Sequence, residues 1–533
     1  MSFASYPFLL LLLPVLLVTW HLVGLLRREW LGGALLLFSL GFLALIDPRA
    51  PLLLLGMVLI NYGFGLALAA PGDTRTSLSR RALLWLAILL NIAPLVIARW
   101  PGLAAGAASV PFLASLPAVP ILSSVAMPGA PAQAPAAPAT FTLAHAVLPG
   151  LAFWILVQLA WLAGVYRRQF EPEGLFRHAV FSSLLPCLPA GPILRYEQVA
   201  GQLDALTGQP ARPTRPAGAP LAVPPGGVEA GDLAAGLARL VIGLAKKVLL
   251  ADTLAIPATA AFAAAADGAP LSWLEAWGGV LCFSLQIYFD FSGYTDMALG
   301  VGRMLGLRLP ENFHSPYRAT GPIEFWRRWH MTLSSWLRDC VYVPLGGEWL
   351  GGARQAIGLA ATMLVVSLWH GFGWGFLAWG ALHAALIVMN HVARVLAGGR
   401  ALESMLASAP VRAICACVTF LLVSLCWVPL RSASLEGAIA MARALAGLGV
   451  PADMPAPGLL AAGVFAAPAS FLVLAAGLAV VFFLPSAREF IYGRPDGSRC
   501  RLALRYVRGW AVLMALLAAA GVLMLDSARP FIF

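Results

Sequence analysis

Long apolar runs without charged residues recur through this 533-residue chain and restrict it to few kinds of fold. The first four lie at about 7–26, 31–46, 50–70 and 82–98. A helix advances about 1.5 Å per residue, so roughly 20 apolar residues cross the hydrocarbon core of a bilayer. These runs therefore predict membrane-spanning helices.

The composition supports this prediction. Hydrophobic residues make up 60% of the chain and charged residues only 11%, whereas soluble domains carry roughly 25% charge. The net charge of +11 forms no basic stripe interleaved with aromatic residues, which argues against a nucleic-acid partner. We predict an all-α polytopic protein embedded in a lipid bilayer, with its excess Lys and Arg in cytoplasmic loops.

Later apolar runs complete the predicted topology. They lie near 145–165, 236–255, 272–298, 411–430, 467–485 and 508–525, with a weaker run near 435–449. The total is roughly 11–13 spans. The first run lacks a preceding basic segment and is followed by Arg27 and Arg28, so it is predicted to be a transmembrane helix rather than a cleaved signal peptide. Its basic loop is assigned to the cytoplasm, which places the N-terminus in the periplasm.

Proline-rich segments interrupt the helices. Residues 101–140 contain no charge and are predicted to form an external loop, and residues 205–230 a cytoplasmic surface insertion. Residues 181–196 are apolar but contain three prolines, which predicts a broken or re-entrant helix packed inside the protein.

Several common chemistries leave no trace in the sequence. The seven cysteines show no metal-binding spacing and are interpreted as small apolar residues. No nucleophile elbow, phosphate-binding loop or HExxH motif is present. No metal site is therefore predicted.

Ionisable residues crowd between residues 286 and 383. Keeping such groups in or near a bilayer is costly, so the crowding predicts a site. The charged members include Asp290, Asp296, Arg303, Arg308, Glu311, Arg318, Glu324, Arg327, Arg328, Arg338 and Asp339. Four of the eight histidines also lie there, namely His314, His330, His370 and His383.

The first half of this stretch contains residues 323–338, which we place on one amphipathic helix lying at an interface or dipping into the protein. On that helix Glu324 can pair with Arg327 or Arg328. His330 is either an interface histidine or a polar group facing a tunnel. Upstream, Lys246 and Lys247 either extend to the membrane interface or help to hold an anionic ligand.

The second half contains His370, which ends the apolar run 361–370 and precedes three closely spaced glycines. Trp369, Trp374 and Trp379 can form the wall of a cavity beside it. A neutral imidazole can accept a proton from a hydroxyl near neutral pH, so His370 is the candidate general base. His383 is 13 residues further on and is assigned a supporting position.

At these residues the chain resembles the membrane-bound O-acyltransferase family, in the branch of the bacterial alginate O-acetyltransferase membrane subunit. D-alanyl-teichoic acid transferases are more distant relatives. The resemblance covers about 145–395. It is carried by LPAGPILRY (188–196), GLAKKVLLAD (243–252), QIYFDFSGYTDMALG (286–300), LPENFHSPYRA (309–319), FWRRWHMTLSSWLRDCVYVPLGG (325–347) and LWHGFGWGFLAWGALH (368–383).

The resemblance implies helices arranged around a central tunnel, with re-entrant and amphipathic helices among them. His370 matches the family's catalytic histidine and His330 its second histidine. The donor substrate would be acetyl-CoA from the cytoplasm, with no permanently bound cofactor. The branch usually has Tyr at Cys340 and Gly at Ala384, and neither departure alters His370.

The remaining site residues complete this prediction. Residues assigned to the donor are Lys246, Lys247, Arg327, Arg328 and Trp329. Residues assigned to positions around the histidines are His383, Trp369, Trp374, Asp290, Asp296 and Asp339. The implied partners are a periplasmic SGNH-type acetyltransferase and an exported polysaccharide, and the implied location is the bacterial inner membrane.

Alternatives stay open at this level. D-alanyl or other acyl transfer to a cell-wall polymer is one, and a polysaccharide transporter or an assembly scaffold without chemistry is another. The predicted segments are N-terminal spans in 1–100, the loop 101–140, a catalytic core in 145–395 and C-terminal spans in 396–533.

Overall fold

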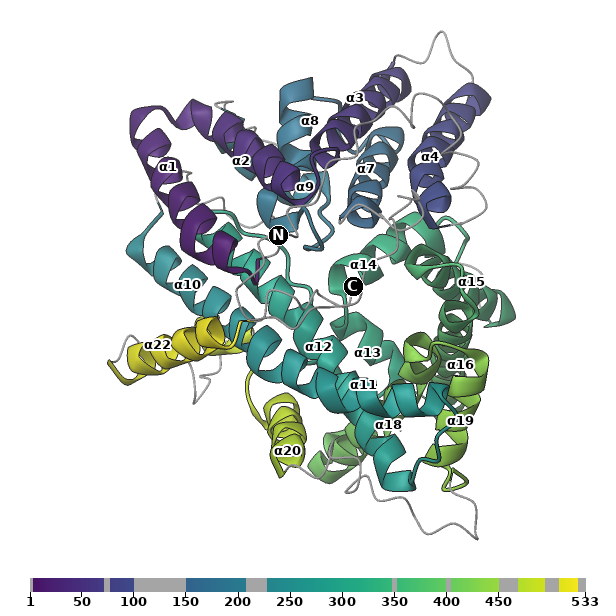
Figure 1. The fold of residues 1–533 in the computed structure, drawn as a ribbon. Helices are drawn as coiled ribbons and strands as arrows, with labels where there is room; N and C mark the ends of the chain where they lie inside the picture. The colour runs from purple at the N-terminus through teal and green to yellow at the C-terminus, as the bar shows by residue number, and fades with distance from the viewer. Residues whose placement is uncertain are drawn as a thin grey trace, which may run out of the picture. The chain divides into compact units, whose positions relative to one another are not determined.

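A computed structural model describes residues 3–70, 77–99, 150–207, 228–347, 352–398, 404–449, 468–493 and 508–525. These residues form helices and connecting segments without a strand, which confirms the all-α prediction (Figure 1). The predicted external loop 101–140 and most of the predicted insertion 205–230 lie outside the described residues.

The chain divides into two compact units, which are described separately. The first comprises Met1 and Val18–Gly226, and the second comprises Ser2–Leu17 and Gly227–Phe533. The first unit contains most of α1 (Leu13–Leu26), followed by α2 (Leu31–Ile46), α3 (Ala50–Ala69), α4 (Ser77–Arg99), α7 (Leu151–Tyr166), α8 (Leu175–Ser182) and α9 (Tyr196–Thr207).

Two buried asparagines inside the first unit pair with each other. Asn61 on α3 and Asn91 on α4 exchange two amide hydrogen bonds of 2.7 and 3.0 Å. Such reciprocal bonds satisfy buried donors and acceptors that lipid cannot. The proline-containing segment after α8 contains only a short 3₁₀ turn, Leu185–Cys187, before α9 begins, in agreement with the predicted break.

The second unit is built around α12. Its helices are α10 (Ala230–Ala245), α11 (Asp252–Ala266), α12 (Trp273–Met304), α13 (Pro322–Arg328), α14 (Met331–Leu337), α15 (Gly352–His370), α16 (Trp374–Ala397), α18 (Ala409–Arg431), α19 (Leu435–Leu445), α20 (Pro468–Phe483), α21 (Ala487–Tyr492) and α22 (Arg508–Leu523). A π-helical turn, Lys246–Ala251, joins α10 to α11.

Helix α12 has 32 residues, starts at a capping box formed by Ser272 and Glu275, and is buried along most of its length. It packs closely against α10 because two glycines face each other. A Cβ at Gly243 would lie 2.5 Å from the carbonyl oxygen of Gly293, and a Cβ at Gly293 would lie 2.8 Å from that of Gly243. This close approach brings polar side chains of the two helices into direct contact.

Within the described residues, seven helical segments are long and apolar enough to cross a membrane. They are Phe8–Leu26, Arg28–Ile46, Ala50–Ala69, Ser79–Ile97, Ala230–Ala266, Trp374–Ala397 and Ala409–Arg431. Shorter apolar helices lie at Leu151–Tyr166, Phe471–Phe483 and Trp510–Leu523. The chain is thus a multi-pass membrane protein.

Two predicted elements differ in the structure. The weak span near 435–449 is the 11-residue helix α19, which advances only about 16 Å and is too short to cross alone. The single helix predicted over 323–338 is two helices, α13 and α14, separated at Trp329 and His330.

The break between α13 and α14 has a local cause. His330 adopts a left-handed backbone conformation with φ of 42°. The segment 309–315 supplies replacement bonds, because the amide of Met331 donates to the carbonyl of Asn312 and the amide of His314 to that of Arg328, each over 2.9 Å. The amide of Thr332 donates to the Asn312 side chain over 3.3 Å. A polar segment distant in sequence therefore fixes the break.

Candidate active site

A cavity of about 360 Å³ lies in the second unit. Its walls come from α12, from the segment containing α13 and α14, from α15 and α16, and from the end of α18. The lining residues are Phe283, Gln286, Ile287, Phe291, Trp326, Trp329, His330, Leu333, His370, Phe376, Trp379, Trp427, Leu430 and Arg431. The two histidines singled out in the sequence therefore line one aromatic-walled cavity.

The left-handed break positions the side chain of His330. Its Nδ1 lies 3.0 Å from the side-chain oxygen of Asn312, which also accepts the Thr332 hydroxyl over 2.9 Å. Because that oxygen can only accept, His330 donates from Nδ1, and the lone pair of the neutral ring is on Nε2. Burial, with the nearby His370, holds the pKa of His330 well below its usual range, so the ring is neutral at pH 7.

His370 is the last residue of α15, where the chain turns into α16. A Cβ at Gly371 would lie 2.4 Å from the Phe376 ring, so only glycine allows this turn to pack. The imidazole packs against Trp379 and Trp369, with ring centroids 5.3 and 4.7 Å away. Of the three tryptophans proposed as cavity walls, Trp379 lines the cavity, whereas Trp369 and Trp374 are absent from its lining.

His383 lies behind the cavity on α16 and is fully buried. Its Nδ1 accepts a hydrogen bond from Nε1 of Trp326 over 3.3 Å, and its ring lies 5.3 Å from that of Trp379. Both tryptophans line the cavity. His383 thus contacts two residues of the cavity lining, and its supporting role stays a prediction.

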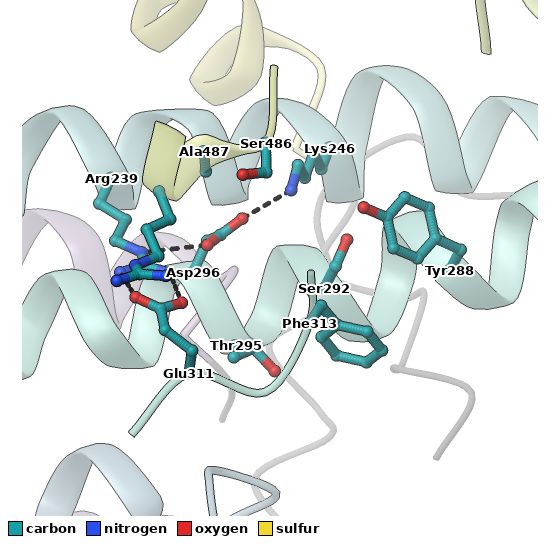
Figure 2. Close-up of a pocket in the computed structure, with 11 residues that line it drawn as sticks. Arg239, Lys246, Tyr288, Ser292, Thr295, Asp296, Glu311, Phe313, Ser486 and Ala487 are labelled. Atoms are coloured by element: carbon teal, nitrogen blue, oxygen red, sulfur yellow. Dashed lines mark hydrogen bonds and ion pairs between the residues drawn. The ribbon is translucent and has the colours of Figure 1, made fainter. Parts of the chain in front are cut away.

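Asp296 lies at the centre of a buried cluster on another face of α12. Its carboxylate accepts Lys246 Nζ over 2.6 Å and Arg239 Nε over 3.0 Å. Arg239 also forms a two-bond pair with Glu311, over 2.7 and 2.5 Å. Figure 2 shows the Asp296 carboxylate between the two cations, and we call these four residues the Asp296 cluster.

Sequence reasoning did not single out Arg239, although a signal was available. Arg239 precedes Lys246 by seven residues, which is two helical turns and places both side chains on one face. The other lysine, Lys247, contacts Asp252 over 2.8 Å and Asp290 over 2.7 Å. Both lysines thus form ion pairs with carboxylates.

The other charged candidates lie apart from the cavity lining. Arg328 pairs with Glu324 over 2.6 Å, which confirms the predicted helical pair, and Asp339 pairs with Arg338 over 2.7 Å. Arg327 is exposed. Among the residues assigned to the donor, only Trp329 belongs to the cavity lining.

Two other residues at this site were also missed by sequence reasoning. Asn312 orients His330, and in the sequence it stands between Glu311 and Phe313, where nothing marks it as a partner of His330. Arg431 lines the cavity from the end of α18, where the sequence suggested only the end of a span. Among the described residues, no group of three or more His, Cys, Asp or Glu side chains is placed to hold a metal ion.

This arrangement suits proton transfer to or from a bound molecule. Two histidines from separate segments face one space, which aromatic side chains line. A neutral imidazole there can accept a proton from a hydroxyl, while a second one donates or accepts a hydrogen bond. Low polarity around the histidines strengthens such interactions.

Comparisons with known proteins show to which family the chain belongs. The family model of MBOAT, the membrane-bound O-acyltransferase family, matches residues 48–428. The probable alginate O-acetylase AlgI of Pseudomonas aeruginosa is 32% identical over 451 residues, covering 84% of this chain and 75% of that protein. The peptidoglycan O-acetyltransferase of Helicobacter pylori is 31% identical over 334 residues, covering 58% of each.

A third relative matches a shorter part. The teichoic acid D-alanyltransferase of Bacillus subtilis is 35% identical over 112 residues, covering 20% of this chain and 28% of that protein. The family match spans most of the chain and includes both cavity histidines. The chain is therefore a membrane O-acyltransferase, and it belongs to the membrane-bound O-acyltransferase family.

Proposed function

We propose that this enzyme transfers an acetyl group from acetyl-CoA to hydroxyl groups of an exported polysaccharide, through a periplasmic SGNH-type acetyltransferase partner. The observation that carries the proposal is the shared cavity of His330 and His370. The relatives named as alginate O-acetylase and peptidoglycan O-acetyltransferase support an acetyl donor and a polymer acceptor.

In the proposed reaction His370 acts as general base. It removes the proton from the accepting hydroxyl as the oxygen attacks the thioester carbonyl. The new carbon–oxygen bond replaces the carbon–sulfur bond, and CoA leaves as a thiolate that takes up the proton. His330 orients a reactant or relays a proton, since Asn312 fixes its ring.

The proposal places the enzyme in the bacterial inner membrane with its N-terminus in the periplasm, so that acetyl-CoA enters from the cytoplasm. Arg327 remains a candidate for the phosphates of CoA because its side chain is exposed. Lys246, Lys247 and Arg328 would have to leave their carboxylate partners to bind phosphate. The acceptor would approach from the opposite side.

The test measures CoA release and acetyl transfer from labelled acetyl-CoA by the protein in nanodiscs. Wild type is compared with His370→Ala and with His391→Ala, a matched control on α16 outside the cavity lining. Turnover in wild type and in His391→Ala, with at least a 100-fold loss in folded His370→Ala, is expected for a general base. Equal turnover in all three would remove His370 from the mechanism.

Acceptor and donor are tested in the same assay. Oligosaccharides and a purified SGNH-type acetyltransferase are supplied separately, so label on the partner identifies a relayed acetyl group. A D-alanyl thioester of a carrier protein replaces acetyl-CoA in a parallel reaction. Turnover with the D-alanyl donor but not with acetyl-CoA would show that the enzyme transfers D-alanyl rather than acetyl groups.

A further inference from the structure

Among the described residues, Arg431 is the one permanently charged residue in the cavity lining, and none of those lining residues is a carboxylate. It is the last residue of α18, and its side chain is partly buried. Lining positions next to the two histidines are where a bound substrate would lie. A cation at this position therefore contacts the same space as the reacting groups.

The contacts of Arg431 leave most of its hydrogen-bonding capacity unused. Its Nη2 donates to the hydroxyl of Thr259 over 3.2 Å, and its guanidinium lies over the rings of Phe262 and Phe283 at 5.8 and 5.7 Å. No ion pair with an acidic side chain forms within the part of the chain that the structure describes. A guanidinium carries five N–H donors, so several remain for a ligand.

The surroundings of Arg431 favour an anionic ligand. Aromatic faces stabilise the cation without neutralising it, because they contribute no net negative charge. The walls of the cavity are mostly apolar, and in such surroundings a charge-assisted hydrogen bond is stronger than in water. The planar guanidinium can bind two oxygens of a carboxylate or phosphate at once.

We propose that Arg431 binds an oxyanion of the substrate in the cavity, either a carboxylate of a sugar acceptor or a phosphate of the CoA donor. The proposal rests on the proposed function, because it assumes that donor or acceptor enters this cavity. It assigns Arg431 to substrate binding and orientation rather than to proton transfer. The hydrogen bond to Thr259 holds the guanidinium at the cavity edge.

The test measures binding of three probes to the protein in nanodiscs by calorimetry. The probes are CoA, a uronic acid trisaccharide and the corresponding neutral trisaccharide. Wild type is compared with Arg431→Gln, with Arg431→Lys and with Arg443→Gln, a control at an exposed arginine on α19. Thermal unfolding of each variant is recorded, because a purely structural arginine would change stability without selecting among probes.

One anionic probe is expected to lose about 10-fold or more in affinity in Arg431→Gln, while the neutral probe and Arg443→Gln are unchanged. Loss for the trisaccharide identifies the acceptor as the source, and loss for CoA identifies the donor. Arg431→Lys keeps the positive charge but lacks the planar guanidinium that binds two oxygens at once. Its affinity for the anionic probe should therefore lie between those of wild type and Arg431→Gln. Should Arg431→Gln fail to fold, a selective loss in Arg431→Lys supports the proposal.

Equal affinities for every probe in wild type and in the Arg431 variants would overturn the proposal, as would the absence of binding to wild type. Binding does not require turnover, so the result is independent of the acetyl-transfer assay. A wild type that binds an anionic probe through Arg431 but transfers no acetyl group would contradict the proposed function alone. Normal acetyl transfer with unchanged binding in Arg431→Gln would contradict this inference alone.

Discussion

Helix α12 contributes to two polar regions that differ in how their charges are compensated. In the Asp296 cluster, two cations face two carboxylates at 2.5–3.0 Å. In the cavity, two histidines and Arg431 face aromatic walls, and no carboxylate is among the described lining residues. The pocket beside the cluster holds about 10 Å³, against about 360 Å³ for the cavity.

This difference separates two reasons for placing polar groups inside a membrane protein. A space of 10 Å³ holds about one water molecule, so the cluster has no room for a substrate. Its charges neutralise each other and connect α10, α12 and the segment containing Glu311. The cavity has the space that a ligand requires, and among the described residues its one permanent charge, that of Arg431, has no carboxylate beside it in the lining. The crowding of charged residues in the sequence therefore does not identify the site. The pairing of those charges and the volume of the space beside them do.

The largest expected effect tests whether the cavity histidines act together. His370→Ala should lower turnover by about 10²–10⁴-fold if it removes a general base, and His330→Ala by less. The double variant should lose less than the product of the two single losses, because both side chains serve one step. Initial rates of CoA release for the four proteins measure this coupling. Fully multiplicative losses would mean that the two histidines act independently.

Breaking the Asp296 cluster should reduce stability rather than substrate affinity. Asp296→Ala leaves Lys246 without its carboxylate in a buried position, and the expected loss is about 3–5 kcal/mol of unfolding free energy. Thermal or denaturant unfolding in detergent measures it. Lys246→Met should leave the KM for acetyl-CoA unchanged, because Lys246 pairs with Asp296 rather than with the donor. A raised KM with unchanged stability would restore Lys246 as a donor-binding residue.

Asn312 connects the two regions, and its loss should have an intermediate effect. Its side-chain nitrogen donates to Thr295, which lines the cluster pocket, over 3.4 Å, and its oxygen accepts from the Thr332 hydroxyl. Asn312→Ala removes these partners and that of His330, so we expect about 1–3 kcal/mol lower stability. The kcat should fall as well. A normal kcat would show that His330 keeps its orientation without Asn312.

The smallest effect on stability is expected at Glu324, which forms a half-buried ion pair with Arg328 outside both regions. Burial raises the pKa of its carboxyl, but bonds from Thr320 and the charge of Arg328 outweigh burial and lower it overall. The pair therefore stabilises the fold above the unfolded pKa of about 4.3, and this contribution is lost as the pH falls through the lower folded value.

Glu324→Gln should cost about 0.3–1 kcal/mol at pH 7 and less at pH 4. Unfolding midpoints of wild type and variant at the two pH values give the comparison, with Asp339→Asn as an exposed-pair control. A larger difference at pH 4 than at pH 7 would contradict the assigned sign.

Much of the fold was predictable because span formation depends on local composition. Apolar runs predicted α1–α4 and α7 in the first unit, and α10, α12, α18, α20 and α22 in the second, wherever the structure describes them. The helix predicted over 323–338 was wrong in one respect, since it breaks at His330. The break depends on Asn312, and no feature within 323–338 itself signals that contact.

The candidate site was predictable in part for a related reason. His330 and His370 stand out as polar residues in apolar sequence, and both line the cavity. Their role in catalysis stays a prediction. The sequence did not show which of the charged residues around them form ion pairs, because their partners lie far along the chain. Arg239 pairs with Glu311 across 72 positions, and Arg431 contacts Thr259 across 172.

The sequence by itself determined that this protein is a helical membrane enzyme of the O-acyltransferase family, because hydrophobic run length and local motifs are properties of short segments. Only the tertiary structure decided which ionisable groups neutralise one another and which face an open cavity. The physical reason is that the cost of a buried charge depends on the distance to its partner. That distance is set by helix packing, such as the close contact of α10 with α12, rather than by separation along the chain.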